Sequence, residues 1–184
     1  SDQLNFHVRG ASCSSGKSTD VFDGAWHHLA VAWSSADGAT VFSRDGAPHA
    51  SQTCHAGESI PDGGCLVLAQ EMDSACGDFD FVRQAFAGDL DEIRLWSVAL
   101  GSSDIASHAA GACATSESAA GLYAHWIFSG GQLRDLGPAA RHLSLYGSDA
   151  AVSTTERPPI LTSHPSRDDD ADLAEHCSLA GTCD

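Results

Sequence analysis

The sequence predicts an all-β protein, an antiparallel β-sandwich, from three observations. Short apolar stretches recur at regular spacing along most of the 184 residues, and only residues 102–110 show a helical pattern. Turn residues separate the stretches, and Asp45-Gly46 is a strong two-residue hairpin pattern. Hydrophobic residues make up 42% of the chain, so a buried core can form.

The first half of the chain predicts an antiparallel meander. The expected elements, in order, are strands at 1–9, 26–33 and 40–44 and a return strand through about 51, with turns at 20–24 and 34–38. The stretch at 26–33 has the clearest pattern, because alternation places Leu29, Val31 and Trp33 on one face.

The second half predicts further short strands and the single helix. The expected elements are strands at 65–69, 86–95, 122–128 and 143–146 and a helix at 102–110. The alternation within 86–95 shifts register at Asp91-Glu92, which predicts a β-bulge there. Ser102 is the expected N-cap of the helix.

The charge balance argues against a nucleic-acid partner. The chain has 25 acidic and 9 basic residues and a formal net charge of −16. A surface this negative repels the phosphate backbone of nucleic acids and suits divalent cations or neutral ligands. No apolar run approaches the roughly 18 residues of a membrane span, and no signal peptide is visible. Because the chain starts directly in strand-like sequence, we interpret it as a segment of a longer protein.

Seven cysteines indicate disulfides formed in an oxidising compartment, secreted or extracellular. None lies in a C-x-x-C pair or a zinc-like cluster. Cys54 and Cys65 flank a Gly/Pro turn and are a candidate pair, whereas spacing leaves the other pairings open. The odd count indicates a partner beyond one end of the segment.

The composition changes after residue 155. We expect the β domain to occupy residues 1–155 and an acidic, proline-containing linker to follow at 156–176. Residues 177–184 contain Cys177 and Cys183 and are either the start of a small Cys-rich module or more linker.

Carboxylates and amides are concentrated between residues 70 and 84. Glu71, Asp73, Asp78, Asp80 and Gln84 lie in this short stretch, just before an apolar one. Hard cations such as Ca²⁺ are bound by six to eight such oxygens. The alternative is an ordinary solvated loop in an acidic protein.

Several segments resemble pentraxin and laminin-G-like (concanavalin A-like) jelly-roll domains. Residues 23–33, DGAWHHLAVAW, are similar to the pattern G-x-W-H-H-V-A-V-x-W of these domains, and residues 43–46 to their Y-V-D-G hairpin. Residues 86–105 resemble F-x-G-x-I-D-E-V-R-I-W-N-x-A-L-S-x-x-E-I, and residues 121–146 the segment that often follows. The resemblance covers roughly residues 20–147 and implies a jelly-roll β-sandwich whose opening strands precede this segment.

Residues 68–84 most resemble the pentraxin motif L-G-Q-E-Q-D-S-x-G-G-x-F-(D/E)-x-x-Q. That resemblance implies calcium ligands at Glu71, the carbonyl of Met72, Asp73, Asp80 and Gln84. One residue more than in the motif separates the last two.

The upstream part of the implied calcium site departs from the family pattern. In a D-N-E-L-L strand the family supplies two further ligands, and here only Asp2 matches, because Ser1 replaces the other carboxylate. Cys76 stands where the motif usually has Gly.

Other polar groups are interpreted as structural. His27 and His28 are strand neighbours that point to opposite faces, so they do not converge on one ion. Asp91 and Glu92 are expected to cap a turn or bulge, and the acidic run at 168–170 to be solvated linker.

We expect no enzymatic activity. Laminarinase-type glycosidases share this architecture and need two nearby carboxylates, in an E-x-D-x-x-E motif. Glu71 and Asp73 match the first two acids, but Cys76 occupies the third position.

The resemblance implies a calcium-dependent module of a secreted or cell-surface protein that binds a carbohydrate (as a lectin does) or an anionic ligand. The alternative is a structural or adhesive module that contacts other extracellular proteins, in which calcium only stabilises a loop.

Overall fold

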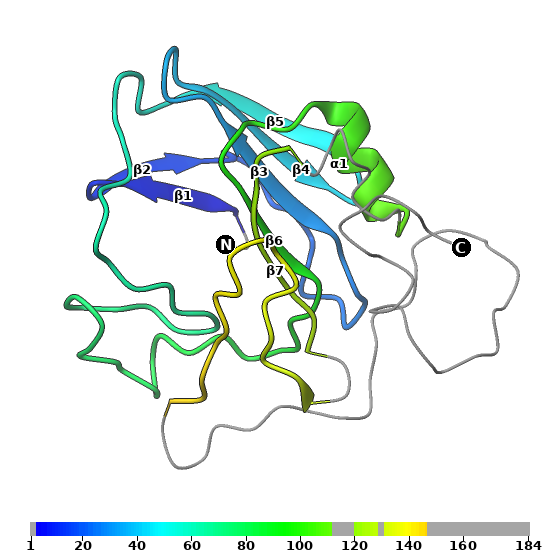
Figure 1. Ribbon diagram of the computed structural model, residues 1–184. Coiled ribbons are helices and arrows are strands. Elements are labelled where there is room, and N and C mark those ends of the chain that lie inside the picture. Colours follow the sequence, from blue (N-terminus) through cyan, green and yellow to red (C-terminus); the bar gives the residue numbers. More distant parts are fainter. Residues whose placement is uncertain (1–2, 112–119, 129–130, 147–184) are drawn as a thin grey trace, which may run out of the picture.

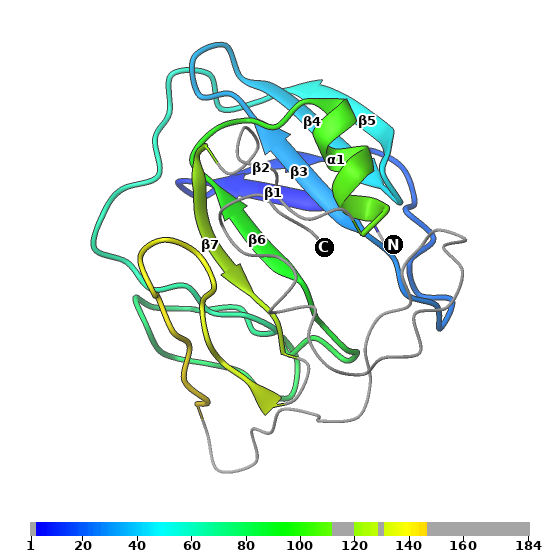
Figure 2. The ribbon, with the colours of Figure 1, turned by 45° about the vertical axis from the view of Figure 1, so that its right-hand side comes forward.

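The computed structural model describes residues 3–111, 120–128 and 131–146, and Figures 1 and 2 show it from two sides. In these residues every strand pair is antiparallel and the helix is short, so the predicted all-β class is confirmed. Asp2, Cys113 and everything predicted at 156–184 lie outside the described residues.

The strands form small antiparallel sheets. Their members are β1 (Asn5–Val8) with β2 (Ala11–Ser14), β3 (Leu29–Trp33) with β4 (Ala39–Arg44) and β5 (Ala47–Thr53), and β6 (Ile93–Trp96) with β7 (Leu122–Trp126). The helix α1 (Ser102–Ala109) lies in the connection from β6 to β7. The predicted meander is the three-stranded sheet, in which the strands are neighbours in the order β3-β4-β5.

The hairpin between β4 and β5 has the predicted two-residue turn. Asp45 and Gly46 have φ angles of 52° and 78°, and positive φ at both positions defines the turn whose twist suits a hairpin. A Cβ at Gly46 would lie 3.0 Å from the Cβ of Ala109 in α1. Glycine is therefore needed here both for the backbone angle and for the close approach of the helix.

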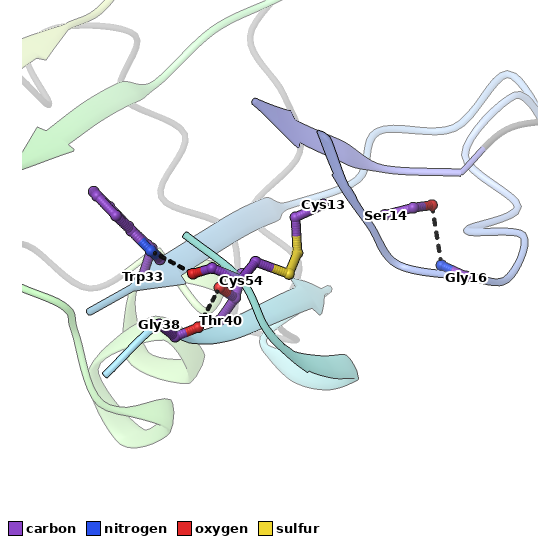
Figure 3. Close-up of a disulfide and its surroundings, with 7 residues drawn as sticks. All are labelled: Cys13, Ser14, Gly16, Trp33, Gly38, Thr40 and Cys54. Carbon is purple, nitrogen blue, oxygen red and sulfur yellow. Dashed lines mark hydrogen bonds between the residues drawn. A yellow bond between two sulfur atoms is a disulfide. The ribbon is translucent and has the colours of Figure 1, made fainter. Parts of the chain in front are cut away.

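A disulfide between Cys13 and Cys54 joins the β1–β2 hairpin to the end of β5 (Figure 3). The Trp33 indole N–H donates to the carbonyl of Cys54 (3.1 Å). The amide of Cys54 in turn donates to the carbonyl of Gly38 (2.8 Å). These contacts fix the end of the β3–β4–β5 sheet against the hairpin.

The core draws on β4, α1 and β7. Phe42 and Ala124 are fully buried, and Trp126, Ile105 and Leu122 nearly so. The Trp126 indole N–H donates to the carbonyl of Arg141 (2.8 Å), so its polar end is satisfied.

Several predicted strands are shorter than expected or absent. The strands expected at 1–9, 26–33 and 122–128 are found as β1, β3 and β7, which cover only part of those stretches. Residues 65–69 form no strand, because Ala69 takes a left-handed φ of 63°, and the nearby bridge, Gln70 to Ala85, begins only after the segment ends. Residues 86–92 are also irregular, so that β6 starts only at Ile93. Residues 143–146 show no strand, although the Leu143 amide donates to the carbonyl of Leu133 (2.9 Å).

Two local details also differ from the prediction. The register irregularity lies between Leu95 and Trp96, whereas at Glu92 the backbone turns with φ 55°. Gly101, not Ser102, is the N-cap of α1 and makes no side-chain cap bond.

The predicted pairing of Cys54 with Cys65 is wrong. Cys54 pairs with Cys13, and Cys65 pairs with Cys76 at a sequence separation of 11. Positions 54 and 65 have the same separation, so spacing alone does not choose between the two pairings.

The long segment from β5 to β6 lies at the end of the molecule away from α1. Figures 1 and 2 both show this teal-to-green segment leaving β5 and running down the side opposite the helix. It contains every residue of the predicted calcium site except Asp2.

Candidate calcium site

Two short segments of the β5–β6 connection lie side by side and carry the predicted ligands. An antiparallel bridge pairs Gln70 with Ala85, and the Phe86 amide donates to the carbonyl of Ala69 (2.8 Å). This pairing places residues 70–73 next to residues 80–84.

Gln84 connects the predicted ligands of the two segments. Its side-chain amide N–H donates to Oδ1 of Asp73 (3.4 Å), and its backbone N–H donates to the carbonyl of Asp80 (3.0 Å). Of the six predicted ligands, the structure thus brings the side chains of Asp73 and Gln84 into contact, and it joins Asp80 to Gln84 through the backbone. Asp2 lies outside the described residues, and Glu71 and Met72 immediately precede Asp73 in sequence.

Gln70 is a residue that the sequence analysis did not single out. Its side-chain N–H group donates to the carbonyls of Glu71 (3.2 Å) and Asp80 (3.3 Å). It therefore ties together the backbones of the two ligand-bearing segments. Its position directly before Glu71 and its match to the Gln of the quoted motif L-G-Q-E are the indications in the sequence.

The side-chain oxygens of Gln70 and Gln84 are buried and have no hydrogen-bond partner among the described residues. An unsatisfied buried acceptor costs about 1–3 kcal/mol. Amide oxygens are among the ligands that calcium prefers. A cation in this loop would satisfy groups that the described part of the chain leaves unpaired.

The Asp80 carboxylate is partly committed to its own turn. Its Oδ1 accepts from the backbone amides of Val82 and Arg83, both at 3.1 Å, and Oδ2 lies 3.8 Å from the Arg83 guanidinium. Its orientation is therefore fixed before any metal binds.

The donor types fit a hard cation. In the described part of the chain, no three His, Cys, Asp or Glu side chains are arranged to hold a metal ion. The candidate set instead mixes carboxylates with amide and backbone carbonyl oxygens, and such all-oxygen sets are typical of calcium rather than zinc.

A second disulfide encloses part of the site. Cys65 and Cys76 close a ring that contains Glu71, Met72 and Asp73. Cys76 has a left-handed φ of 62°. This explains physically why the family motif has Gly there, since Gly adopts positive φ without strain.

His27 has the structural role that the sequence predicts. Its Nδ1 lies 3.0 Å from Oδ2 of Asp45, and its Nε2 lies 3.0 Å from Oδ1 of Asp23, so opposite edges of the ring face two carboxylates. Burial lowers the pKa of His27, but its hydrogen bonds to the Asp45 and Asp23 carboxylates raise that pKa more, and the net pKa is raised.

Asp91 and Glu92 also make structural contacts. Oδ1 of Asp91 accepts from the amides of Glu92 and Phe128, both at 2.8 Å. Oε2 of Glu92 lies 2.8 Å from Arg94 and 3.0 Å from His125. The pair fastens the start of β6 to the end of β7.

Taken together, these features define a disulfide-bonded antiparallel β domain with an oxygen-rich acidic loop. The chain belongs to the pentaxin family: the family model described as "Pentaxin family" matches residues 1–119, more than half of the chain. Pentaxins are extracellular recognition proteins that bind ligands, and the match indicates no enzyme family.

Individual relatives match only part of the chain. It is 44% identical over 78 residues to C-reactive protein of Danio rerio, covering 42% of this chain and 34% of that protein. It is 40% identical over 93 residues to adhesion G protein-coupled receptor D2 of Homo sapiens, covering 50% of this chain and 9% of the receptor. It is 36% identical over 91 residues to neuronal pentraxin-2 of Homo sapiens, covering 46% of this chain and 20% of that protein.

These matches therefore span about a third or less of each relative's length. Within the described residues, no helix has the length and apolar character needed to cross a bilayer.

Proposed function

We propose that this domain is a calcium-dependent binding module for a carbohydrate or an anionic ligand. The proposed ligand set is Asp73, Asp80 and Gln84 with Glu71 and the carbonyl of Met72, and Asp2 as an upstream ligand. A calcium ion bound there would keep open coordination positions that hydroxyl or phosphate oxygens of the ligand fill in place of water.

One observation supports this proposal above the others. The Gln84 side chain joins Asp73 across the two segments while its own oxygen is buried without a partner among the described residues. A solvated acidic loop gives no reason to bury an unpaired acceptor beside carboxylates, because each such acceptor destabilises the fold.

We further propose that the domain is one module of a secreted or cell-surface protein. One relative is named as an adhesion receptor and another, from Rattus norvegicus, as a protein with sushi, von Willebrand factor type A, EGF and pentraxin domains. The domain matches 9% and 2% of these chains, as a module of a larger protein would. The Cys13–Cys54 and Cys65–Cys76 disulfides fit an oxidising compartment.

Calcium titration by calorimetry tests the metal site. We expect binding in the micromolar to millimolar range and a melting temperature that rises with calcium and falls back in chelator. Asp73→Asn should abolish both effects, while Asp62→Asn, an exposed change in the same connection, should leave them unchanged. A folded wild-type protein that shows neither heat nor a melting shift would contradict the proposal.

The ligand-binding step needs a separate experiment. Arrays of neutral and acidic glycans and of phosphate-bearing headgroups, probed in calcium and again in chelator, should show signals that only calcium supports. Ligand signals that persist in chelator would contradict calcium dependence.

The alternative proposal is a structural or adhesive module in which calcium only stabilises the loop. Exposed apolar side chains such as Phe81 (58%) and Val82 (92%) beside Asp80 favour a protein contact surface there. Under this alternative, Asp73→Asn lowers the melting temperature in calcium but leaves partner binding intact.

A further inference from the structure

The Cys65–Cys76 disulfide encloses the first half of the proposed calcium site. The bond spans a sequence separation of 11, and Glu71, Met72 and Asp73 lie inside the ring that it closes. Residues 65–76 contain no helix and no strand, so regular structure does not fix the ligand positions.

Few other contacts hold this ring. On one side of Asp73, Gln70 bridges to Ala85. On the other, Ser74 and Gly77 exchange backbone hydrogen bonds of 3.4 and 3.2 Å. Without the disulfide, these ties and the side-chain hydrogen bonds of Gln70 and Gln84 would have to orient Asp73. Closing a loop reduces the number of conformations that an irregular segment can adopt, so the disulfide adds a covalent constraint to them.

The backbone at Cys76 gives the disulfide a second role. A φ of 62° is unfavourable for a residue with a Cβ, by about 1–2 kcal/mol. Gly at this position reaches that angle freely. In this chain a covalent bond holds Cys76 in the left-handed conformation instead.

The two described disulfides differ in their access to solvent. Cys65 and Cys76 are both exposed, whereas Cys13 is only 3% exposed. A reductant in solution therefore reaches the Cys65–Cys76 bond far more easily than the Cys13–Cys54 bond.

We infer that the Cys65–Cys76 disulfide positions the calcium loop and makes calcium binding sensitive to reduction; the inference rests on the proposed calcium site. A dithiol reductant supplies two electrons and two protons, which convert the bond to two thiols while the reductant forms its own cyclic disulfide. The opened loop loses the fixed placement of Asp73 relative to Gln84, and calcium affinity falls.

The first experiment compares oxidised protein with protein treated with limiting dithiothreitol. Alkylation followed by mass spectrometry establishes that Cys65 and Cys76 are reduced while Cys13 and Cys54 remain joined. We expect a calcium dissociation constant about tenfold higher after opening. Hydrogen exchange should increase in residues 65–76 and stay constant in β3–β5.

Two double variants separate positioning from a general structural role. Cys65→Ser/Cys76→Ser keeps a Cβ at the left-handed position without the bond, whereas Cys65→Ser/Cys76→Gly removes the backbone strain. The calcium affinity of both variants should not change on addition of the reductant. The glycine variant should bind calcium more tightly than the serine variant. Melting temperatures without calcium control for folding.

The outcomes are distinguishable. If oxidised wild-type protein binds calcium and the opened form binds equally well, the positioning role is wrong and the proposed function survives. If the oxidised protein binds no calcium, the proposed function fails and this inference fails with it.

Discussion

Single residues decide whether the acidic connection is a site or only a loop. Gln70 and Gln84 each use their amide N–H groups to join the two segments and leave their oxygens buried. The carboxylate of Asp80 is already oriented by two backbone amides. Much of the entropic cost of arranging ligands is therefore met by the fold itself, which favours binding.

Gln84→Ala removes an amide oxygen and the contact with Asp73. We expect the calcium dissociation constant to rise about tenfold, the equivalent of 1.4 kcal/mol, with little change in the far-UV circular dichroism spectrum. Gln132→Ala, at an exposed position outside the connection, is the matched control. Equal affinities in the two variants would remove Gln84 from the ligand set.

The His27 cluster predicts a pH dependence of stability. The folded state raises the pKa of His27 above its ordinary 6.5, so its contribution is fully present below about pH 6.5 and is lost as pH rises through the raised pKa. Because Asp23 and Asp45 are largely exposed, the contribution is about 0.5–1 kcal/mol. His27→Gln should flatten this part of the melting-temperature profile, and His7→Gln, an exposed change on β1, should not.

At the scale of elements, local sequence patterns predict those turns, strands and helices that interactions between neighbouring residues determine. The Asp45-Gly46 turn, strand β4 and helix α1 follow from neighbouring residues and are found where they are expected, whereas β3 covers only the second part of its predicted stretch, from Leu29. The segments at 65–69 and 86–92 have strand-like composition but form no strand, and the nearest pairing is the Gln70–Ala85 bridge between them. Left-handed residues such as Ala69 and Glu92 interrupt the extended backbone.

The proposed ligand set comes only from the family motif. Composition alone indicates an acidic loop, while the convergence around Gln84 and the role of Gln70 depend on the Gln70–Ala85 bridge. The disulfide pairings depend on where β2 lies against the end of β5, which spacing does not encode.

The Cys13–Cys54 disulfide predicts a large contribution to stability. It closes a sequence separation of 41 and connects two separate sheets. Replacing both cysteines with Ala should lower the free energy of unfolding by about 2–4 kcal/mol in urea denaturation. Cys65→Ser/Cys76→Ser should lower it less, since that bond closes a shorter, exposed loop; a larger effect there would reverse this ranking.

For the whole molecule, the net charge of −16 means that any cation stabilises the fold to some degree. NaCl and MgCl₂ matched to CaCl₂ in ionic strength should raise the melting temperature slightly, through screening alone. Calcium should raise it further, because magnesium requires a smaller octahedral site and releases its water reluctantly. Identical shifts in all three salts would mean that the acidic loop only collects counterions.

The two described disulfides close rings that do not overlap, one spanning residues 13–54 and the other 65–76. A protease that cuts after Arg44, inside the first ring, leaves its products joined, so they migrate together on a non-reducing gel. A cut after Glu58, in the exposed stretch between the rings, leaves neither of these bonds across the break. Cleavage there would leave no described covalent bond between the acidic loop and the meander.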